Sequence, residues 1–296
     1  MGYKALDAHM KGEKHKRYAD SQATTVPIRM FAASVGLSTA NANANIAPAL
    51  VSSGPSTSTT FDTLSIIGGN DAKEGKWKWM VQLNFTTDGI TTWGCGGTIL
   101  NDQEEDWRRS MVVVGARSLD EGVARYMAIK HFIKHPEYRS FHGGNQNNIA
   151  LIQLKKKLKP EHVTPVTLPN ANEVFDESSE CWVTGWGKVG RNELPAPKTL
   201  QEVKLPIVRA DVCKSKYNWL SSDVLCVGGK LGGIGACKGD EGGPLVCKTA
   251  RGYVQAGIVS FGNAQGCGLP KEPSVYTRVS KYLTFINDYS YASGEV

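Results

Sequence analysis

The sequence predicts an all-β domain that runs from residue 66 to residue 296 and closes with a C-terminal helix. Three observations predict it: short runs rich in Val, Ile, Trp and Thr, clusters of Gly, Pro, Asn and Asp between them, and a helical pattern confined to the end. The expected strands cover 79–85, 94–100, 111–114, 149–154, 180–186, 200–208, 244–248, 253–261 and 275–279. The expected helix covers 280–289, where Tyr282, Leu283, Phe285, Ile286 and Tyr289 can share one face.

The first 65 residues have a different composition. Residues 34–60 are rich in Ser, Thr, Ala, Asn, Gly and Pro and hold few large side chains to bury, so residues 1–65 are predicted to form a disordered, low-complexity leader. The short apolar run at 29–37 is the best candidate for the core of a signal peptide, although it is internal and weakly apolar. No stretch approaches the roughly 20 apolar residues of a transmembrane helix, and we predict no membrane partner.

The charge pattern argues against a nucleic-acid partner. The formal net charge is +6, from 34 Lys and Arg residues against 28 Asp and Glu residues, and both signs are scattered along the chain. The densest basic group consists of Lys155, Lys156, Lys157 and Lys159. It follows an apolar run, which is more typical of a solvated strand end than of a phosphate site.

Cysteine use indicates an oxidising compartment. All seven cysteines follow residue 90, and the sequence has neither a CxxC pair nor His-rich metal spacing. This pattern favours a disulfide framework in a secreted or extracellular protein over a metal or cofactor site. Asn84 begins an Asn-Phe-Thr acceptor pattern for N-glycosylation, which agrees with secretion. The odd count leaves one thiol unpaired.

Seven short motifs occur in a fixed order after residue 65. They are IIGG at 66–69, WGCGGT at 93–98, NIALI at 148–152, CWVTGWG at 181–187, GDEGGPL at 239–245, GIVSFG at 257–262 and VYTRV at 275–279. Together they resemble the trypsin and chymotrypsin family of serine endopeptidases, peptidase family S1. The resemblance implies two six-stranded antiparallel Greek-key barrels followed by a C-terminal helix.

The resemblance also implies how the cysteines pair. It joins Cys181 to Cys247, Cys213 to Cys226, and Cys237 to Cys267. Cys95 is left as a free thiol, because its partner in the family lies beside the catalytic His on a segment that this chain lacks.

The catalytic positions of the family hold unsuitable residues here. The nucleophilic Ser of the family's GDSGGP motif is replaced by Glu241, which is a poor nucleophile and brings negative charge to the site where an oxyanion would develop. The oxyanion hole itself corresponds to the backbone N–H groups of Gly239 and Glu241, toward which the Glu241 side chain can fold. An acid–base pair of Asp240 and Glu241 is disfavoured, because the family commits that Asp to the freed N-terminus.

The imidazole and the carboxylate that orients it are also missing. Asn148 stands where the family has Asp, a change that lowers turnover about 10⁴-fold in a known triad. The family's TAAHC motif follows the CGG strand, but residues 95–110 contain no His. The histidines elsewhere, His9, His15, His131, His135, His142 and His162, are poor substitutes for it. We expect the first barrel to lack the strand that carries this motif, which would open an edge.

Activation and specificity residues depart from the family as well. Ile66 follows Leu64-Ser65, so a trypsin-like activator has no basic residue to cut after, and the family's ion pair between Ile66 and Asp240 is not expected to form. Gly235 replaces the Asp that selects Lys or Arg at the base of the specificity pocket. The expected lining, Gly235, Ser260, Phe261, Gly262 and Ser274, favours apolar or small side chains, and is equally consistent with a glycine-rich loop.

We therefore predict a catalytically inactive serine peptidase homologue that binds a protein or peptide partner or competes with active relatives, and that needs no cofactor or metal. Two alternatives stay open at this point. One is a working serine-type endopeptidase whose recorded sequence lacks the His segment. The other is an unstable product of a degraded gene.

Overall fold

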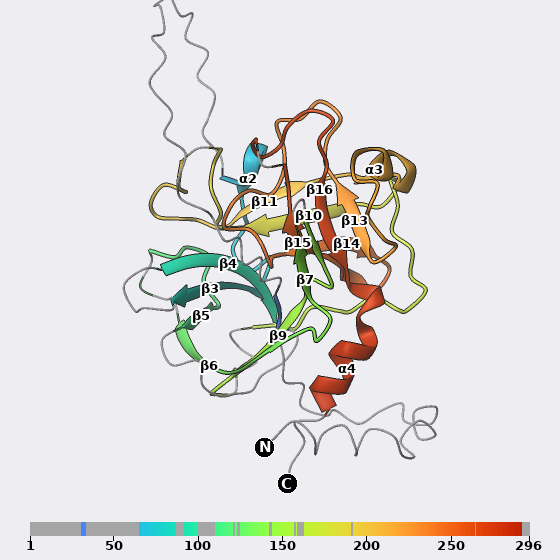
Figure 1. Ribbon diagram of the computed structural model, residues 1–296. Helices are drawn as coiled ribbons and strands as arrows, with labels where there is room; N and C mark the ends of the chain where they lie inside the picture. Colours follow the sequence, from blue (N-terminus) through green and yellow to red (C-terminus); the bar gives the residue numbers. More distant parts are fainter. Residues whose placement is uncertain are drawn as a thin grey trace, which may run out of the picture.

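Two curled antiparallel sheets make up most of the protein (Figure 1). The computed structural model describes residues 31–33, 65–86, 92–99, 110–120, 122, 125–141, 144–156, 158, 163–190, 192–263 and 265–291. The predicted all-β, two-barrel fold with a C-terminal helix is confirmed.

The first sheet closes into a barrel of six strands in the order β1-β4-β3-β5-β6-β9. Its strands are β1 (Phe31–Ala33), β3 (Met80–Thr86), β4 (Thr92–Ile99), β5 (Met111–Val114), β6 (Arg125–Lys134) and β9 (Ala150–Leu154). All five residues of β9 are buried. Successive side chains of a strand point to opposite faces, so Ile152 and Leu154 pack inside the barrel while Leu151 packs on the side of the second sheet.

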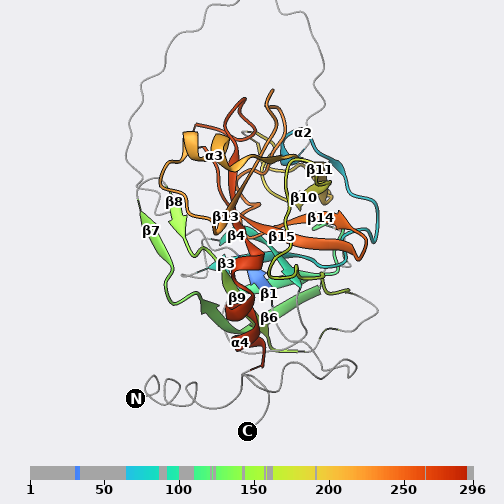
Figure 2. The same ribbon diagram turned by 90° about the vertical axis from the view of Figure 1, so that its right-hand side faces the viewer.

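The sixth strand of this barrel comes from the leader. The chain from residue 66 onward supplies five strands, as the missing motif implies, but β1 pairs with both β4 and β9 and closes the expected gap (Figure 2). The expectation of an open edge is therefore wrong, and so is the expectation of disorder for residues 31–33. Apart from Ser65, the rest of the predicted leader lies outside the described residues.

The second sheet has eight strands rather than six. They are β12 (Ile207–Val208), β13 (Val224–Val227), β16 (Ser274–Arg278), β15 (Gly252–Phe261), β14 (Pro244–Thr249), β10 (Cys181–Gly185), β11 (Gln201–Lys204) and β2 (Asn70–Asp71), in that spatial order. The two additional strands, β12 and β2, are two-residue pairings at the edges of the sheet. Two further strands, β7 (Arg139–Phe141) and β8 (Gly144–Gln146), form a separate hairpin.

Three disulfides brace the second half of the chain. They join Cys181 to Cys247, Cys213 to Cys226, and Cys237 to Cys267. The pairing implied by the family resemblance is confirmed, and Cys95 is a buried free thiol.

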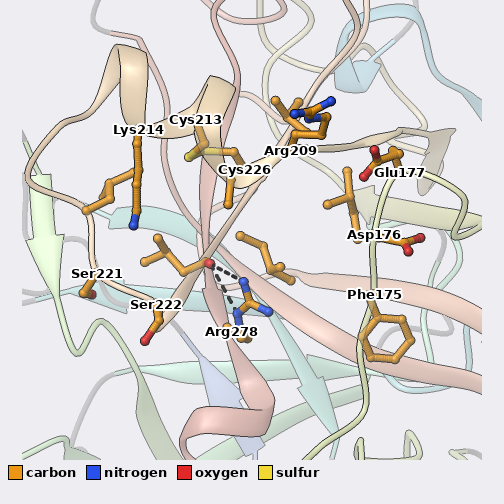
Figure 3. Close-up of a pocket in the computed structure, with 16 residues that line it drawn as sticks. Phe175, Asp176, Glu177, Arg209, Cys213, Lys214, Ser221, Ser222, Cys226 and Arg278 are labelled. Carbon is orange, nitrogen blue, oxygen red and sulfur yellow. Dashed lines mark hydrogen bonds between the residues drawn. A yellow bond between two sulfur atoms is a disulfide. The ribbon is translucent and has the colours of Figure 1, made fainter.

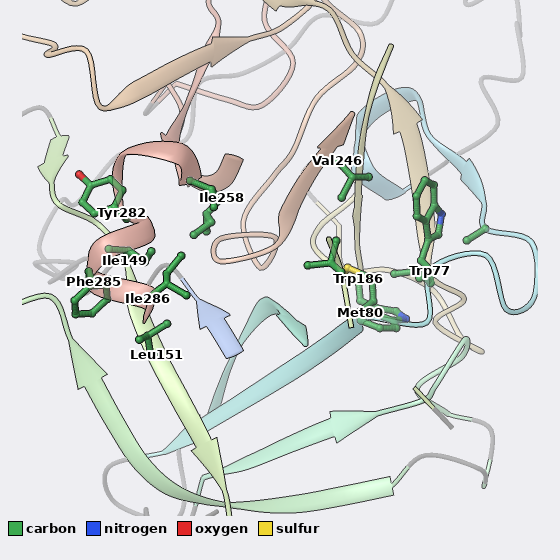
Figure 4. Packing of buried hydrophobic residues seen from close by; sticks show 14 of the residues in the cluster. Trp77, Met80, Ile149, Leu151, Trp186, Val246, Ile258, Tyr282, Phe285 and Ile286 are labelled. Atoms are coloured by element: carbon green, nitrogen blue, oxygen red, sulfur yellow. The ribbon is translucent and has the colours of Figure 1, made fainter. Parts of the chain in front are cut away.

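Each barrel encloses its own core, and a third core lies between the barrels. The first barrel is filled by Val81, Leu83, Val112, Val114, Ile129, Ile152 and Leu154. The second is filled by Val183, Val203, Leu225, Leu245, Ala256 and Tyr276, among others. The third core, shown in Figure 4, contains Trp77, Met80, Ile149, Leu151, Trp186, Val246 and Ile258. The catalytic positions under discussion flank this third core.

The C-terminal helix α4 (Leu283–Tyr291) covers the junction between the barrels. It follows the 3-10 turn η2 (Val279–Lys281). Phe285 and Ile286 of α4, and Tyr282 between the two elements, are buried in the same core cluster as Ile149 and Leu151 (Figure 4). This is the predicted apolar face. A second helix, α3 (Ala210–Lys216), packs on β13 through the Cys213–Cys226 disulfide and was not predicted.

Candidate functional site

The turn that leads into β14 carries Asp240 and Glu241. Gly239 has φ +98°, which side-chain-bearing residues rarely adopt, and a Cβ there would lie 3.1 Å from Gly187 Cα. The turn therefore depends on glycine at 239. It brings residue 241 to the base of β4, where the Glu241 carbonyl accepts a hydrogen bond of 2.8 Å from Gly96 N–H.

The Glu241 side chain folds back on this turn. Its Oε2 accepts a hydrogen bond of 2.7 Å from the backbone N–H of Gly239. That N–H is one of the two that the family resemblance assigns to the oxyanion hole. A carboxylate held there satisfies the donor internally and sets a negative charge at the place where a reaction intermediate would need a positive potential.

Cys95 lies close enough to Glu241 for the two to interact electrostatically. Burial, reinforced by the negative charge of Glu241, raises the pKa of the Cys95 thiol to about 12. A thiol with so high a pKa stays protonated at neutral pH and is a poor nucleophile. Cys95 therefore does not replace the missing hydroxyl.

Asn148 occupies a buried position just before β9. Its Nδ2 donates to Ser260 Oγ at 2.8 Å, and its carbonyl accepts from Thr277 Oγ1 at 2.8 Å. These bonds tie Asn148 to β15 and β16 of the second sheet. An amide in this position carries no charge with which to orient or stabilise an imidazolium.

Two histidines belong to the described residues, and both are engaged elsewhere. His131 Nδ1 lies 2.8 Å from Gln153 Oε1. The ring of His135 packs against Phe285 of α4 with centroids 4.7 Å apart, and burial lowers its pKa despite the opposing charge of Glu137. His9, His15, His142 and His162 lie outside the described residues, as do residues 100–109, where the family motif is missing.

Asp240 is fully buried, and residue 66 does not provide a positive charge to pair with its carboxylate. Its Oδ1 accepts from Gly187 N–H at 2.8 Å and its Oδ2 from Cys237 N–H at 2.9 Å. Ile66, also fully buried, follows Ser65 by a peptide bond and so has an amide nitrogen rather than an ammonium. Desolvation outweighs the two hydrogen bonds and raises the pKa of Asp240 to about 7.

The specificity-pocket residues come from three segments of the second sheet and its loops. Gly235 N–H bonds to the Ile67 carbonyl at 3.0 Å, which fixes this loop against the segment α2 (Ser65–Gly68). A Cβ at Gly262 would lie 3.3 Å from Ser274 Oγ, so Gly262 and Ser274 face each other closely. Ser260 is buried beneath Asn148, and Phe261 is half-buried.

Phe261 belongs to a cluster of four aromatic side chains that the sequence did not predict. Trp219 stacks on Phe261 with centroids 5.7 Å apart and meets Phe141 edge-on at 4.8 Å, and Tyr217 packs against both Trp219 and Phe261. Phe141 lies on the β7–β8 hairpin and is 39% exposed. Because its members are far apart in sequence, no local pattern could have revealed this surface, which we call the aromatic face.

A cavity lies elsewhere, beneath α3 (Figure 3). It measures about 270 Å³ and is lined in part by Phe175, Arg209, Lys214 and Arg278. The guanidinium of Arg278 donates to the Val224 carbonyl from Nε at 3.3 Å and from Nη2 at 3.0 Å. None of the catalytic or specificity positions lines this cavity.

Metal binding and membrane insertion find no support in the described part of the chain. There, no group of three or more His, Cys, Asp or Glu side chains is arranged to hold a metal ion. No helix among those residues has the length and apolar character needed to cross a bilayer. The glycosylation candidate Asn84 lies within β3, half-buried and paired on both sides with Gly94 and Met111, and its modification stays a prediction.

Comparison with known proteins agrees with the fold and the order of these motifs. The family model described as Trypsin matches residues 66–286. A protein of Mus musculus named "Tryptase" is 35% identical over 250 residues, which cover 76% of this chain and 88% of the mouse protein. The chain belongs to the trypsin-like S1 family of serine peptidases.

Proposed function

We propose that this protein is a secreted, catalytically inactive member of its family that acts by binding an extended segment of a protein partner. The observation that carries the proposal is the hydrogen bond from Gly239 N–H to the Glu241 carboxylate. It gives the chain an internal anion in the oxyanion site in place of a nucleophile. Inactivity then follows from the position of one side chain and does not depend on the residues outside the described ranges.

Two further features support the loss of catalysis. Asn148 is neutral and already bonded to Ser260, and the buried Asp240 receives no ammonium from residue 66. The first leaves a histidine nothing to orient it, and the second removes the ion pair that the family uses to order this turn. Substitution at 241 alone would therefore not restore turnover.

Binding is supported by what the site retains. Phe261 and Ser274 pair with neighbouring strands of the second sheet, Gly235 is bonded to the Ile67 carbonyl, and Phe261 joins the aromatic face. Aromatic side chains on a rigid scaffold are the residues most often responsible for binding energy at protein interfaces. Three disulfides support a secreted location.

The proposal is tested with a fluorophosphonate probe, which reacts covalently with an activated serine. We expect the purified chain to be labelled no more than the same chain after heat denaturation. The variant Glu241→Ser restores the hydroxyl alone and should also stay unlabelled, because no imidazole activates it. An active trypsin run in parallel shows that the probe is competent. Labelling of the native chain above the denatured sample would reject the proposal and favour a working endopeptidase.

A further inference from the structure

The first barrel contains a slot between β4 and β9 that none of the described strands after residue 65 fills. On their other edges, β4 pairs with β3 and β9 pairs with β6. Their facing edges both pair with β1: Phe31 lies opposite Ile99 and Ile152, and Ala32 lies opposite Thr98 and Leu151. Without β1, both strands would present unpaired N–H and C=O groups to each other across the gap.

The borders of this slot are buried when β1 occupies it. With β1 in place, Thr98, Leu151 and Ile152 have no exposed surface. Backbone polar groups next to such residues have limited access to water, so they need a partner from the protein itself. A strand that pairs on both sides supplies these partners and also covers the apolar core of the barrel.

The strand that occupies this slot, β1, comes from an unexpected part of the sequence. The family places the missing strand in the interval between β4 and β5, which ends at Ile99 and resumes at Met111. The slot is instead filled by residues that precede Ser65 by more than 30 positions. Fully extended, a connection of this length can reach about 100 Å, so it does not constrain where β1 binds.

We propose that Phe31–Ala33 is a donor strand, and that the slot between β4 and β9 is a strand-binding site whose ligand is the leader of the same chain. Pairing on both sides then holds the leader on the domain independently of the covalent connection. The segment Phe31–Ala33 is then a structural part of the folded domain, and it stays bound after the connection is cut. This role holds whether or not the chain is catalytically active.

The decisive experiment cuts that connection in the full-length protein. Residues 56–60 are replaced by the recognition sequence of a site-specific protease, the folded chain is cleaved, and the products are separated by native size-exclusion chromatography. We expect the N-terminal fragment to co-elute with the domain in a one-to-one ratio and to separate from it only in denaturant. Release of the fragment without denaturant, from a domain that keeps its circular-dichroism spectrum, would overturn the proposal.

A pair of matched variants locates the contact. Proline lacks the N–H that a strand paired on both sides needs, so Ala32→Pro should reduce the retained fragment at least 10-fold. Ala42→Pro makes the same change ten residues away, outside β1, and should retain the fragment fully. Equal retention in both variants would contradict a role for β1. If the Ala32→Pro variant does not fold, retention of the N-terminal fragment by the cleaved wild-type chain still tests the proposal.

Discussion

Single residues decide the chemistry of this protein. In a working serine peptidase, the turn before β14 presents a hydroxyl and leaves two backbone N–H groups free for an oxyanion. Here Glu241 supplies an anion that binds Gly239 N–H at 2.7 Å. The contact spans only two residues, which is why the sequence alone could anticipate it. The hydrogen bond between Asn148 and Ser260 joins residues 112 positions apart, so it could be found only in the folded structure.

The buried carboxylate of Asp240 makes a testable difference at the residue scale. Its pKa is raised to about 7 by burial, above the ordinary value near 4 that it has in the unfolded chain. Between these two values the folded protein holds a proton that the unfolded chain releases. The contribution of Asp240 to the free energy of unfolding therefore falls as pH rises from about 4 to about 7.

The variant Asp240→Asn isolates this effect, because an amide resembles the protonated carboxyl and does not titrate. We expect its free energy of unfolding to gain on that of the wild type as pH rises across this window, by up to about 4 kcal/mol. Urea denaturation at pH 4, 5.5, 7 and 8 measures the difference. A wild type that instead gains stability relative to the variant over the window would indicate an Asp240 paired with a cation.

At the scale of elements, the sequence predicted most of the buried strands, although it missed β13, in which three of four residues are buried. The apolar runs of β9, β10, β14 and β15 were recognised because nearly every residue in them is buried. The strand β6 was missed, since only Ile129 of its ten residues is buried and charged residues interrupt the pattern. The strand β1 was missed because three residues in a low-complexity segment carry no periodicity, and its partners lie more than 60 residues away.

The aromatic face is built from several elements, and substitution of one of its side chains tests its role in binding. Trp219 touches Phe141 from the β7–β8 hairpin and Phe261 from β15. If this face binds partner segments, Trp219→Ala should weaken binding about 30-fold, as expected for the loss of an aromatic anchor worth about 2 kcal/mol. The probe is a library of immobilised synthetic decapeptides, ranked first with the wild-type protein.

The matched control is Leu231→Ala, which removes an apolar side chain that is 93% exposed and makes no part of the aromatic face. It should leave peptide binding unchanged. Circular dichroism and thermal unfolding show whether both variants are folded. Equal binding by the wild type and Trp219→Ala would assign partner recognition to another surface.

At the scale of the whole molecule, the trypsin-like fold is kept around the positions from which we propose that the catalytic groups have been lost. The first barrel is closed, the second sheet has eight strands, three disulfides are in place, and α4 covers the junction between the two sheets. An unstable product of a degraded gene would not be expected to replace a missing strand with another segment of its own chain. The retained architecture fits a protein that still presents a surface to a partner.

Turnover of a chromogenic peptide ester by the purified full-length chain tests the loss of catalysis most directly, because ester cleavage demands less of the active site than peptide cleavage. The account predicts a rate equal to that of the buffer blank at every peptide sequence and at every pH from 5 to 9. Saturable turnover above the blank that disappears in the Glu241→Ala variant would contradict it.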